Sequence, residues 1–325
     1  MELIEEISGN VFMITLPVPL DMNHVHIFAL FHHGKVTLFD AGLNTPETIS
    51  GLDEALKTVG KSFRDVDRIF ITHAHADHYG IAGLIRGYSG ASVHISAIGR
   101  LALRKDRRGD RLTGPMKKFY LRHGLSEKEI APLEPLFRDI ANYATPLEAD
   151  DCMELEMFET VDGNTIEVIP TPGHTAGHVC FFFREKGILL AGDHVLPEIT
   201  PNLSPDFFTP DFRPLPSFLH SLSRVGELPV IKTYPAHGAP FSDLKGRIEE
   251  IKQHHRERKD RVLAAVQSGI QTTFLIAQFV FGKNLREFDR FLAVNETYVH
   301  LVELENEGRI TSREREGLLL RYTAV

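Results

Sequence analysis

The chain has 325 residues, of which 42% are hydrophobic and 25% charged, with a net charge of −8, so it holds ample apolar material for a core. The first six residues lack the basic start and apolar run of a secretory signal, and no apolar stretch approaches the ~18 residues that span a bilayer. Two distant cysteines, Cys152 and Cys180, exclude a disulfide framework. We therefore expect a cytoplasmic protein that is neither exported nor embedded in a membrane, with one large and one small domain.

The first part of the chain is expected to form short strands separated by turns rich in Gly, Asn and Pro. The stretches with this pattern are 11–15, 25–30, 36–39, 68–71 and 92–96. A helix should begin after Thr45, because Thr45 can cap it and Pro46 stands at its first position, and it should run to about Val59.

A second group of strands follows later in the chain. It is expected at 166–169, 179–183, 188–191 and 230–233, with a helix near 216–226 before the last strand. Two strand-rich halves with helices outside predict an α+β fold, arranged as an αββα sandwich of two packed mixed sheets. Cys180 lies in one of the apolar strands, where it acts as a small buried side chain.

A charged insertion, at about residues 100–160, separates the two groups of strands. Residues 100–123 carry nine Lys or Arg against two acids, and residues 127–159 carry ten acids against two bases. In one interpretation the two parts neutralise each other at the surface. In the other, the basic part is a rim for an anionic substrate, with Arg107, Arg108 and Arg111 as binding residues.

The C-terminal part changes character after Phe241. Helices are expected at 243–266, 272–281 and 287–307, followed by a β-hairpin at 309–323 with its turn at 313–317. This order suggests a winged-helix module, so we divide the chain into a catalytic domain, 1–243, and a C-terminal helical, winged-helix-like domain, 244–325. From residue 244 onward, 14 Lys or Arg nearly balance 12 Asp or Glu, which favours packing beside the active site over binding to duplex DNA.

Four potential metal ligands crowd the turn after the strand at 68–71: His73, His75, Asp77 and His78. Without a metal, three imidazoles and a carboxylate this close would need another partner, whereas a strand end followed by a helix can aim them at one ion. Three further candidates stand at expected strand ends, namely His174, Asp193 and His237. Five histidines and two aspartates suffice for two metal ions that share one carboxylate.

This ordered set of motifs resembles that of the metallo-β-lactamase superfamily, whose HxHxDH signature residues 73–78 match literally. The resemblance implies that the first metal is held by His73, His75 and His174, the second by Asp77, His78 and His237, with Asp193 as the bridge. Asp40, after the strand at 36–39, matches an early aspartate that orients a ligand histidine. The resemblance covers the chain up to about Asp243 and also implies the αββα sandwich.

Two residues narrow the choice among branches of this superfamily. True metallo-β-lactamases generally lack an aspartate at the position of Asp193, and the iron-flavin oxidoreductases usually carry glutamate where His75 stands. The pattern is similar to glyoxalase II, lactonases and the β-lactamase-like ribonucleases, whose C-terminal extension the segment after 243 resembles. A mononuclear iron persulfide dioxygenase shares much of the ligand set and stays open as a minority alternative.

The expected function is hydrolysis of a thioester, a lactone or another ester by hydroxide that a pair of metal ions generates from water near neutral pH. Asp77 and Asp40 are the candidate catalytic aspartates, since Asp77 can also receive the proton. Zinc suits this donor set best, and manganese or iron would also suit it. The expected partner is a small anionic substrate, with RNA as the alternative for a single-strand endoribonuclease or phosphodiesterase; a homodimer stays open, and no membrane partner is expected.

Three further residues are candidates for substrate binding. The proline-rich stretch 197–216 should be a stiff loop, and its Phe207 and Phe208 either wall the substrate pocket or only cover core edges. His194 is either a proton donor near the metals or a residue that supports the ligands, and the second role is favoured because seven ligands already complete the site.

Overall fold

The structure is a computed structural model that describes residues 3–19, 23–106, 114–161, 163–207, 209, 211–315 and 319–325. Four of the residues that the sequence nominates for substrate binding lie outside the described residues: Arg107, Arg108, Arg111 and Phe208.

Within the described residues, the first sheet has seven strands that follow one another in chain order. They are β1 (Ile4–Ser8), β2 (Val11–Pro17), β3 (His24–His32), β4 (Lys35–Phe39), β5 (Val66–Phe70), β6 (Ser92–Ile95) and β7 (Cys152–Glu154). Strands β1 to β4 pair antiparallel, and β4 to β7 pair parallel. Both faces of this sheet are covered, so β2 and β3 are buried along most of their length instead of alternating.

The second sheet has five described strands in the order β12-β11-β10-β9-β8. They are β8 (Phe158–Val161), β9 (Asn164–Pro170), β10 (Val179–Phe183), β11 (Ile188–Gly192) and β12 (Lys232–Pro235). Only the pair β11–β12 is parallel, and the other neighbours in this sheet are antiparallel.

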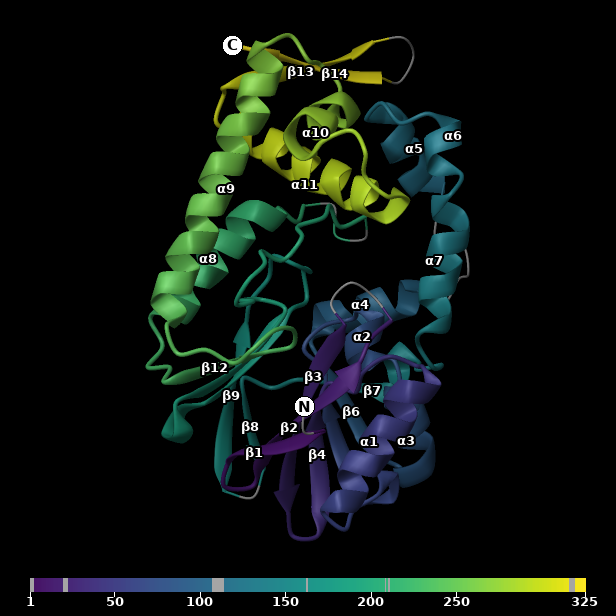
Figure 1. The fold of residues 1–325 in the computed structure, drawn as a ribbon, viewed down its shortest axis with the longest axis vertical. Coiled ribbons are helices and arrows are strands. Elements are labelled where there is room, and N and C mark those ends of the chain that lie inside the picture. The colour runs from purple at the N-terminus through teal and green to yellow at the C-terminus, as the bar shows by residue number, and fades with distance from the viewer. Residues whose placement is uncertain are drawn as a thin grey trace.

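The two sheets pack face to face and are covered by helices on their outer faces (Figure 1). Between the sheets, the ring centroid of Phe39 lies 5.1 Å from that of Phe181 and 5.6 Å from that of Phe183. Helices α1 (Pro46–Thr58) and α3 (Ala82–Ser89) cover the first sheet, and α8 (Pro214–Gly226) and α9 (Leu244–Gln267) cover the second. The expected α+β fold and αββα sandwich are confirmed.

The charged insertion contributes four helices among the described residues, and the last three of them pack against the C-terminal part of the chain. Its helices are α4 (Ala97–Asp106), α5 (Gly114–Arg122), α6 (Glu127–Ile130) and α7 (Leu133–Asn142). Tyr120 of α5 is buried in a common core with Phe274 and Phe291, and its hydroxyl donates to Asn295 Oδ1 at 2.8 Å. Single 3₁₀ turns stand at Phe63–Asp65, Ala149–Asp151 and Arg184–Lys186.

The C-terminal part forms the predicted three helices and hairpin. After α9 come α10 (Thr273–Phe281), α11 (Glu287–Asn306) and the antiparallel pair β13 (Ile310–Arg315) and β14 (Leu319–Ala324). These later elements lie at one end of the molecule in Figure 1, and α9 runs from that end alongside α8. Helix α9 also packs on the second sheet, so the structure does not separate the two parts of the chain at Asp243. The division into two domains and the winged-helix likeness stay predictions.

Some predicted boundaries were wrong. Helix α8 begins at Pro214, so the last three residues of the predicted loop 197–216 are helical, because proline fits the first turn of a helix. Strand β12 lies two residues later than predicted, and β1, β7 and β8 were not predicted. The start of α1 is as expected, since the Thr45 side chain accepts a hydrogen bond from Thr48 N. Among the described residues, every helix is too short or too polar to cross a membrane.

Candidate metal centre

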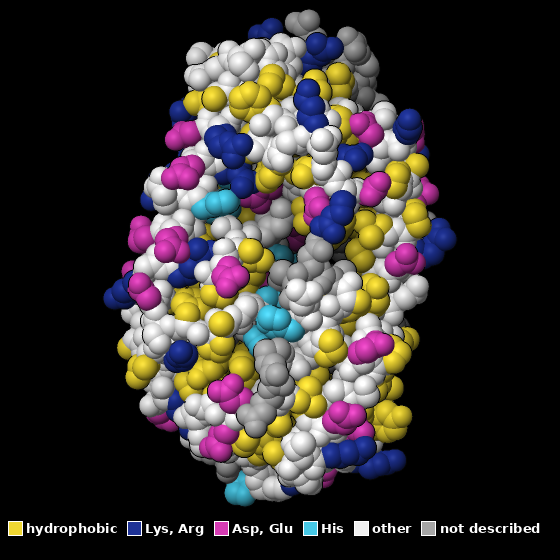
Figure 2. Space-filling model, in the orientation of Figure 1, with side chains coloured by type: hydrophobic (Ala, Val, Ile, Leu, Met, Phe, Trp, Pro, Cys, Tyr) yellow, Lys and Arg dark blue, Asp and Glu magenta, His cyan; other side chains and the backbone are white. Residues whose placement is uncertain are grey.

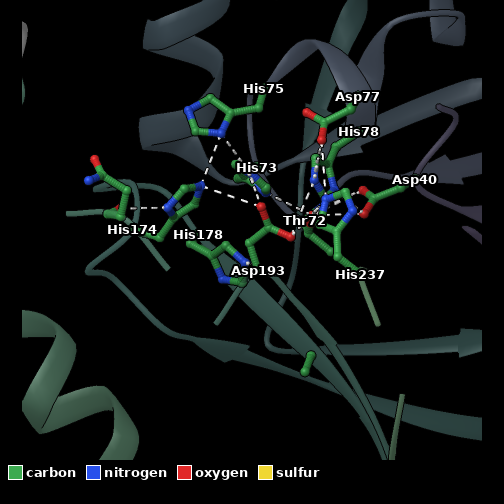
Figure 3. A network of polar contacts seen from close by, with 12 residues as sticks. Asp40, Thr72, His73, His75, Asp77, His78, His174, His178, Asp193 and His237 are labelled. Carbon is green, nitrogen blue, oxygen red and sulfur yellow. Dashed lines mark hydrogen bonds and ion pairs between the residues drawn. The ribbon is translucent and has the colours of Figure 1, made fainter. Parts of the chain in front are cut away.

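All seven candidate ligands lie where strands of the two sheets end at a shared edge of the sandwich, and their side chains converge there (Figure 3). His73 and His75 lie in the loop after β5, Asp77 and His78 in the short helix α2 (Ala76–Tyr79), and His174, Asp193 and His237 after β9, β11 and β12. Residues from distant parts of the sequence thus form one polar cluster.

The first group of ligand atoms comes from three histidines and one aspartate. His75 Nδ1 lies 2.9 Å from His73 Nε2 and 3.0 Å from His174 Nε2. Asp193 Oδ2 faces the same point, 3.5 Å from His174 Nε2 and 3.9 Å from His73 Nε2. His73 is fully buried and His75 is exposed, so this group opens to solvent on the side of His75.

The second group comes from Asp77, His78 and His237. Asp77 Oδ2 lies 3.3 Å from His237 Nε2 and 3.6 Å from His78 Nε2. The other oxygen of Asp193, Oδ1, lies 3.5 Å from His237 Nε2 and 3.6 Å from His78 Nε2. Asp193 therefore points one oxygen at each group, which is the geometry that a bridging carboxylate requires.

In three of the candidate ligand histidines, the second ring nitrogen donates a hydrogen bond to a protein acceptor. His174 Nδ1 donates to Asn202 O at 2.9 Å, and His237 Nδ1 donates to His24 O at 2.7 Å. His78 Nδ1 donates to Asp40 Oδ2 at 2.8 Å. With Nδ1 protonated in this way, the lone pair on Nε2 of each ring points into the cluster, ready to bind a cation.

Asp40 connects β4 to the ligand loop. Its backbone has a φ of 62°, a left-handed conformation that aspartate tolerates better than most residues. Its carboxylate accepts hydrogen bonds from Thr72 N at 2.8 Å, from Thr72 Oγ1 and from His78 Nδ1. Asp40 thus orients a ligand histidine, as the sequence resemblance implies.

The polar atoms at the centre of the cluster fit bound metal ions. Three buried atoms have no hydrogen-bond partner among the described residues, namely His78 Nε2, Asp193 Oδ1 and His237 Nε2. Buried polar atoms are rarely left unpaired, and these three are imidazole nitrogens and a carboxylate oxygen, the donors that zinc and similar ions prefer.

The electrostatics of the second group also favour a cation. Burial works against protonation of His78, but the carboxylates of Asp77, Asp193 and Asp40 outweigh it and raise its pKa well above the usual value. Burial works against ionisation of Asp193 as well, yet His237 and His78 hold its pKa well below its usual value. The carboxylate of Asp193 is therefore ionised and attracts positive charge to the cluster. Divalent ions would supply this charge in place of the protons on the histidines.

Reasoning from the sequence missed His178 and Thr72. The Nε2 of His178 accepts a hydrogen bond from Asp193 N at 3.1 Å, and its Nδ1 donates to Thr171 Oγ1 at 2.8 Å. His178 therefore fixes the backbone of Asp193, the candidate bridging ligand (Figure 3). The only signal in the sequence is its place directly before an apolar strand that neighbours the ligand-bearing strands.

The remaining candidates for substrate binding among the described residues are His194 and Phe207. His194 is fully buried, with its ring centroid 5.2 Å from that of Phe218, and burial lowers its pKa to about 3. Phe207 packs against Phe119 of α5 and lines a cavity of about 210 Å³ together with Phe212 and other residues of its loop. Figure 2 shows histidine side chains at the middle of one face of the molecule.

Known proteins share both the sequence pattern and the fold. The family model described as the metallo-beta-lactamase superfamily matches residues 20–237. The chain is 28% identical to the "Probable metallo-hydrolase YqjP" of Bacillus subtilis, over 94% of this chain and 95% of that protein. It is 25% identical to the "Beta-lactamase-like protein 2 homolog" of Caenorhabditis elegans, over 84% of this chain and 76% of that protein.

Solved structures agree. A metallo-beta-lactamase family protein from Thermus thermophilus has a TM-score of 0.84 and 29% identity, over 97% of this chain and 99% of that one. A beta-lactamase domain protein from Burkholderia ambifaria has the same fold, with a TM-score of 0.84 and 22% identity over 99% of this chain and 94% of that one. Since the family model covers most of the chain and the ligand motifs lie within it, the chain belongs to the metallo-β-lactamase superfamily.

Proposed function

We propose that this protein is a dinuclear metal-dependent hydrolase that cleaves a thioester, a lactone or another ester of a small anionic molecule. The observation that carries the proposal is Asp193, whose two oxygens face two separate groups of ligand atoms. The likeness to a protein described as a probable metallo-hydrolase supports the same reaction class.

The metal ions and the residues of the centre would have different roles in such a reaction. When bound, two divalent ions supply activation of water near neutral pH and polarisation of the bond to be cleaved. Burial opposes ionisation of Asp77, but His78 and His237 outweigh it and lower its pKa, so its carboxylate is charged near neutral pH and can offer an oxygen to a metal ion. Exposed His75 marks the side from which substrate reaches the centre.

Zinc is the proposed metal, because imidazole and carboxylate donors in this number suit it, while manganese or iron would also suit them. A mononuclear iron dioxygenase is disfavoured, since the second group would then leave buried His237 Nε2 and His78 Nε2 without a partner among the described residues.

The ester substrate is supported by the loop beside the centre. The carbonyl of Asn202 orients His174, and further along the same loop Phe207 and Phe212 line the cavity of about 210 Å³ with Tyr298 of α11. Aromatic walls suit the acyl group of such an ester, while Arg213 of the same lining is paired with Glu303.

Cleavage of single-stranded RNA is the second candidate, motivated by the basic residues of 100–123. Two of these bases are already paired in the structure: Lys117 Nζ lies 2.7 Å from Glu127 Oε2, and Arg122 Nη2 lies 3.6 Å from Glu314 Oε2. Such pairing weakens the positive field that RNA would need, so the ester substrate ranks first.

The test is a panel of thioester, lactone, ester, phosphodiester and RNA substrates, assayed with zinc, manganese or iron. His75→Ala, Asp77→Ala and Asp193→Ala are each expected to abolish hydrolysis while the metal-free proteins keep the wild-type circular dichroism spectrum. Asp260→Ala, at an exposed position on α9, is the control and should keep full activity. Turnover retained in all three variants would refute the proposal, and cutting of RNA alone would replace the ester substrate by the second candidate.

A further inference from the structure

A second cluster of metal-ligating side chains lies apart from the dinuclear centre, between α9 and α11. It consists of His255 on α9 and of Glu296 and His300 on α11. All three are almost fully buried, with 2%, 4% and 0% of their surface exposed. Glu296 and His300 are four residues apart in one helix, which places both on the same face.

We propose that His255, Glu296 and His300 bind one divalent transition-metal ion, with zinc preferred by the donor set, and that this ion joins α9 to α11. Each residue offers one ligand atom, and these atoms lie within 4.8 Å of one another. Two imidazoles and a carboxylate form a donor set that zinc accepts, with a fourth position left for water.

The distances in this cluster fit a shared ion. His255 Nδ1 lies 3.3 Å from His300 Nε2, which is long for the hydrogen bond that these atoms form in the absence of an ion. Two nitrogens bound to one zinc at about 2.0–2.1 Å in tetrahedral geometry stand about 3.3–3.4 Å apart. His255 Nδ1 is 3.7 Å from Glu296 Oε1, within the 3.3–3.9 Å between nitrogens and carboxylate oxygens in the dinuclear centre.

The surrounding hydrogen bonds leave the inward atoms free for this role. His300 Nδ1 donates to the backbone oxygen of Glu296 at 2.7 Å, so the lone pair of His300 Nε2 faces His255. Glu296 Oε2 accepts from Leu203 N at 3.0 Å, which leaves Oε1 toward the histidines. Protein acceptors orient the ligand histidines of the dinuclear centre in the same manner.

The carboxyl group of Glu296 is buried without a Lys or Arg partner. Among the described residues, its ion-pair contacts within 4 Å are His255 at 3.7 Å and His300 at 4.0 Å. Arg258 of α9 also acts on Glu296, but its Nη2 is directed at His254 Nε2, 3.1 Å away, and it forms no ion pair with Glu296 within 4 Å in the described part of the chain.

The site would anchor the loop beside the active site. Leu203, held by Glu296, directly follows Asn202, whose carbonyl orients the ligand His174. An ion at this position would therefore fix α9, α11 and the loop that backs the dinuclear centre. The inference does not depend on the reaction that the dinuclear centre catalyses.

The test counts metal ions in the full-length protein after it has been stripped with chelator and reloaded with Co²⁺ or Zn²⁺. Wild type is expected to bind three equivalents per chain, measured by inductively coupled plasma mass spectrometry. His255→Phe keeps the ring packing against Phe218, whose centroid is 5.6 Å away, and is expected to bind one equivalent fewer. His254→Phe changes the adjacent histidine, which lies outside the cluster, and should keep all three.

A second variant keeps the proposal testable if His255→Phe does not fold. With His73, His78 and Asp193 all replaced by alanine, the dinuclear centre is disrupted, and one equivalent of Co²⁺ with visible absorption typical of tetrahedral coordination should remain. That absorption should disappear when Glu296→Gln is added. Two equivalents in wild type, or no change in Co²⁺ binding on replacing His255 or Glu296, would overturn the proposal.

Discussion

Asp40 organises the candidate metal centre although it offers no ligand atom of its own. It holds Thr72 and His78 by hydrogen bonds from a backbone conformation that few residue types adopt easily. Asn shares this conformational tolerance, so the amide tests the charge and the acceptor pattern without a change in backbone.

Asp40→Asn is expected to weaken binding of the second metal by about 10–100-fold, because the amide cannot accept all the hydrogen bonds that the carboxylate accepts. Zinc affinity measured by competition with a chromophoric chelator checks this, with exposed Asp260→Asn as the control. Equal affinity in Asp40→Asn and wild type would contradict the positioning role.

His123 links the charged insertion to the C-terminal helices, and its protonation is expected to make the unfolding free energy depend on pH under acidic conditions. Its Nδ1 shares a hydrogen bond of 2.7 Å with Thr273 Oγ1, and burial, followed by the charge of Arg122, lowers its pKa to about 3. The unfolded chain protonates this histidine at about pH 6.5, so between about pH 6.5 and 3 the unfolded state binds one more proton. Stability is therefore lost as pH falls through this window and is unaffected above it.

His123→Gln is expected to reduce the slope of unfolding free energy against pH by up to about 1.4 kcal/mol per pH unit within this window. Urea unfolding at several pH values, in the presence of chelator so that metal release does not contribute, measures the slope. His220→Gln, at an exposed position, controls for the loss of a histidine. An undiminished slope in His123→Gln would show that this ring is protonated in the folded protein.

At the scale of single residues, the sequence nominated the candidate ligands and the supporting Asp40, and it missed the support from Thr72 and His178. The spacing of His73, His75 and His78 carries its own signal, because several donors in one turn need a shared partner. The role of His178 arises only when folding brings Thr171 and Asp193 to its two ring nitrogens. No local spacing encodes such a pair of contacts.

Helix α2, which carries Asp77 and His78, is held in place by very close backbone packing at Gly80. A Cβ atom on Gly80 would lie 2.4 Å from Ala76 O, 2.5 Å from Tyr143 O and 2.6 Å from Gly42 O. Backbone carbonyls cannot move aside as flexible side chains can, so the segment after α2 needs glycine here.

Gly80→Ala is expected to lower the unfolding free energy by about 1–3 kcal/mol through overpacking and to weaken metal binding by shifting α2. Gly87→Ala in α3 is the matched control, because no atom lies within 4 Å of its added Cβ. Alanine there should stabilise the helix by about 0.5–1 kcal/mol. Chemical unfolding of both variants gives the comparison, and equal stability of the two would refute the packing argument.

At the scale of elements, strands with continuous apolar sequence were predictable and short exposed strands were not. Strands β2 to β6 were found near their predicted positions because their residues are largely buried. Strand β1 is mostly half-buried or exposed, and β7 and β8 are short and carry charged residues. These segments form strands because each pairs with a neighbouring strand, and the sequence pattern does not show which strand that neighbour is.

Across the whole molecule, the C-terminal helices share a core with the second sheet. Leu244, Ile248 and Ile251 of α9 lie in one apolar cluster with Phe182 of β10 and Phe218 of α8. These side chains remove a continuous apolar surface from water, which is the dominant stabilising contribution in a fold of this kind.

A chain that ends at Asp243 is expected to be less stable than the full chain, because its second sheet and α8 would expose this surface. The measurements are thermal unfolding and binding of a hydrophobic dye, with a chain that ends after Gly308 as the control. That control removes the hairpin β13–β14, which packs against the C-terminal helices and lies outside the core of the second sheet. A chain of residues 1–243 as stable as the full chain would show an independent domain.

The sequence by itself determined the fold class, the places of the main strands along the chain and the set of candidate metal ligands, because apolar periodicity and dense donor motifs are local properties of the chain. Only the tertiary structure decided which atoms meet: that Asp193 faces both ligand groups, that His178 supports it, and that His255 on α9 stands beside Glu296 and His300 on α11. These contacts join segments far apart in the chain, and they exist only where the packing of sheets and helices brings those segments together.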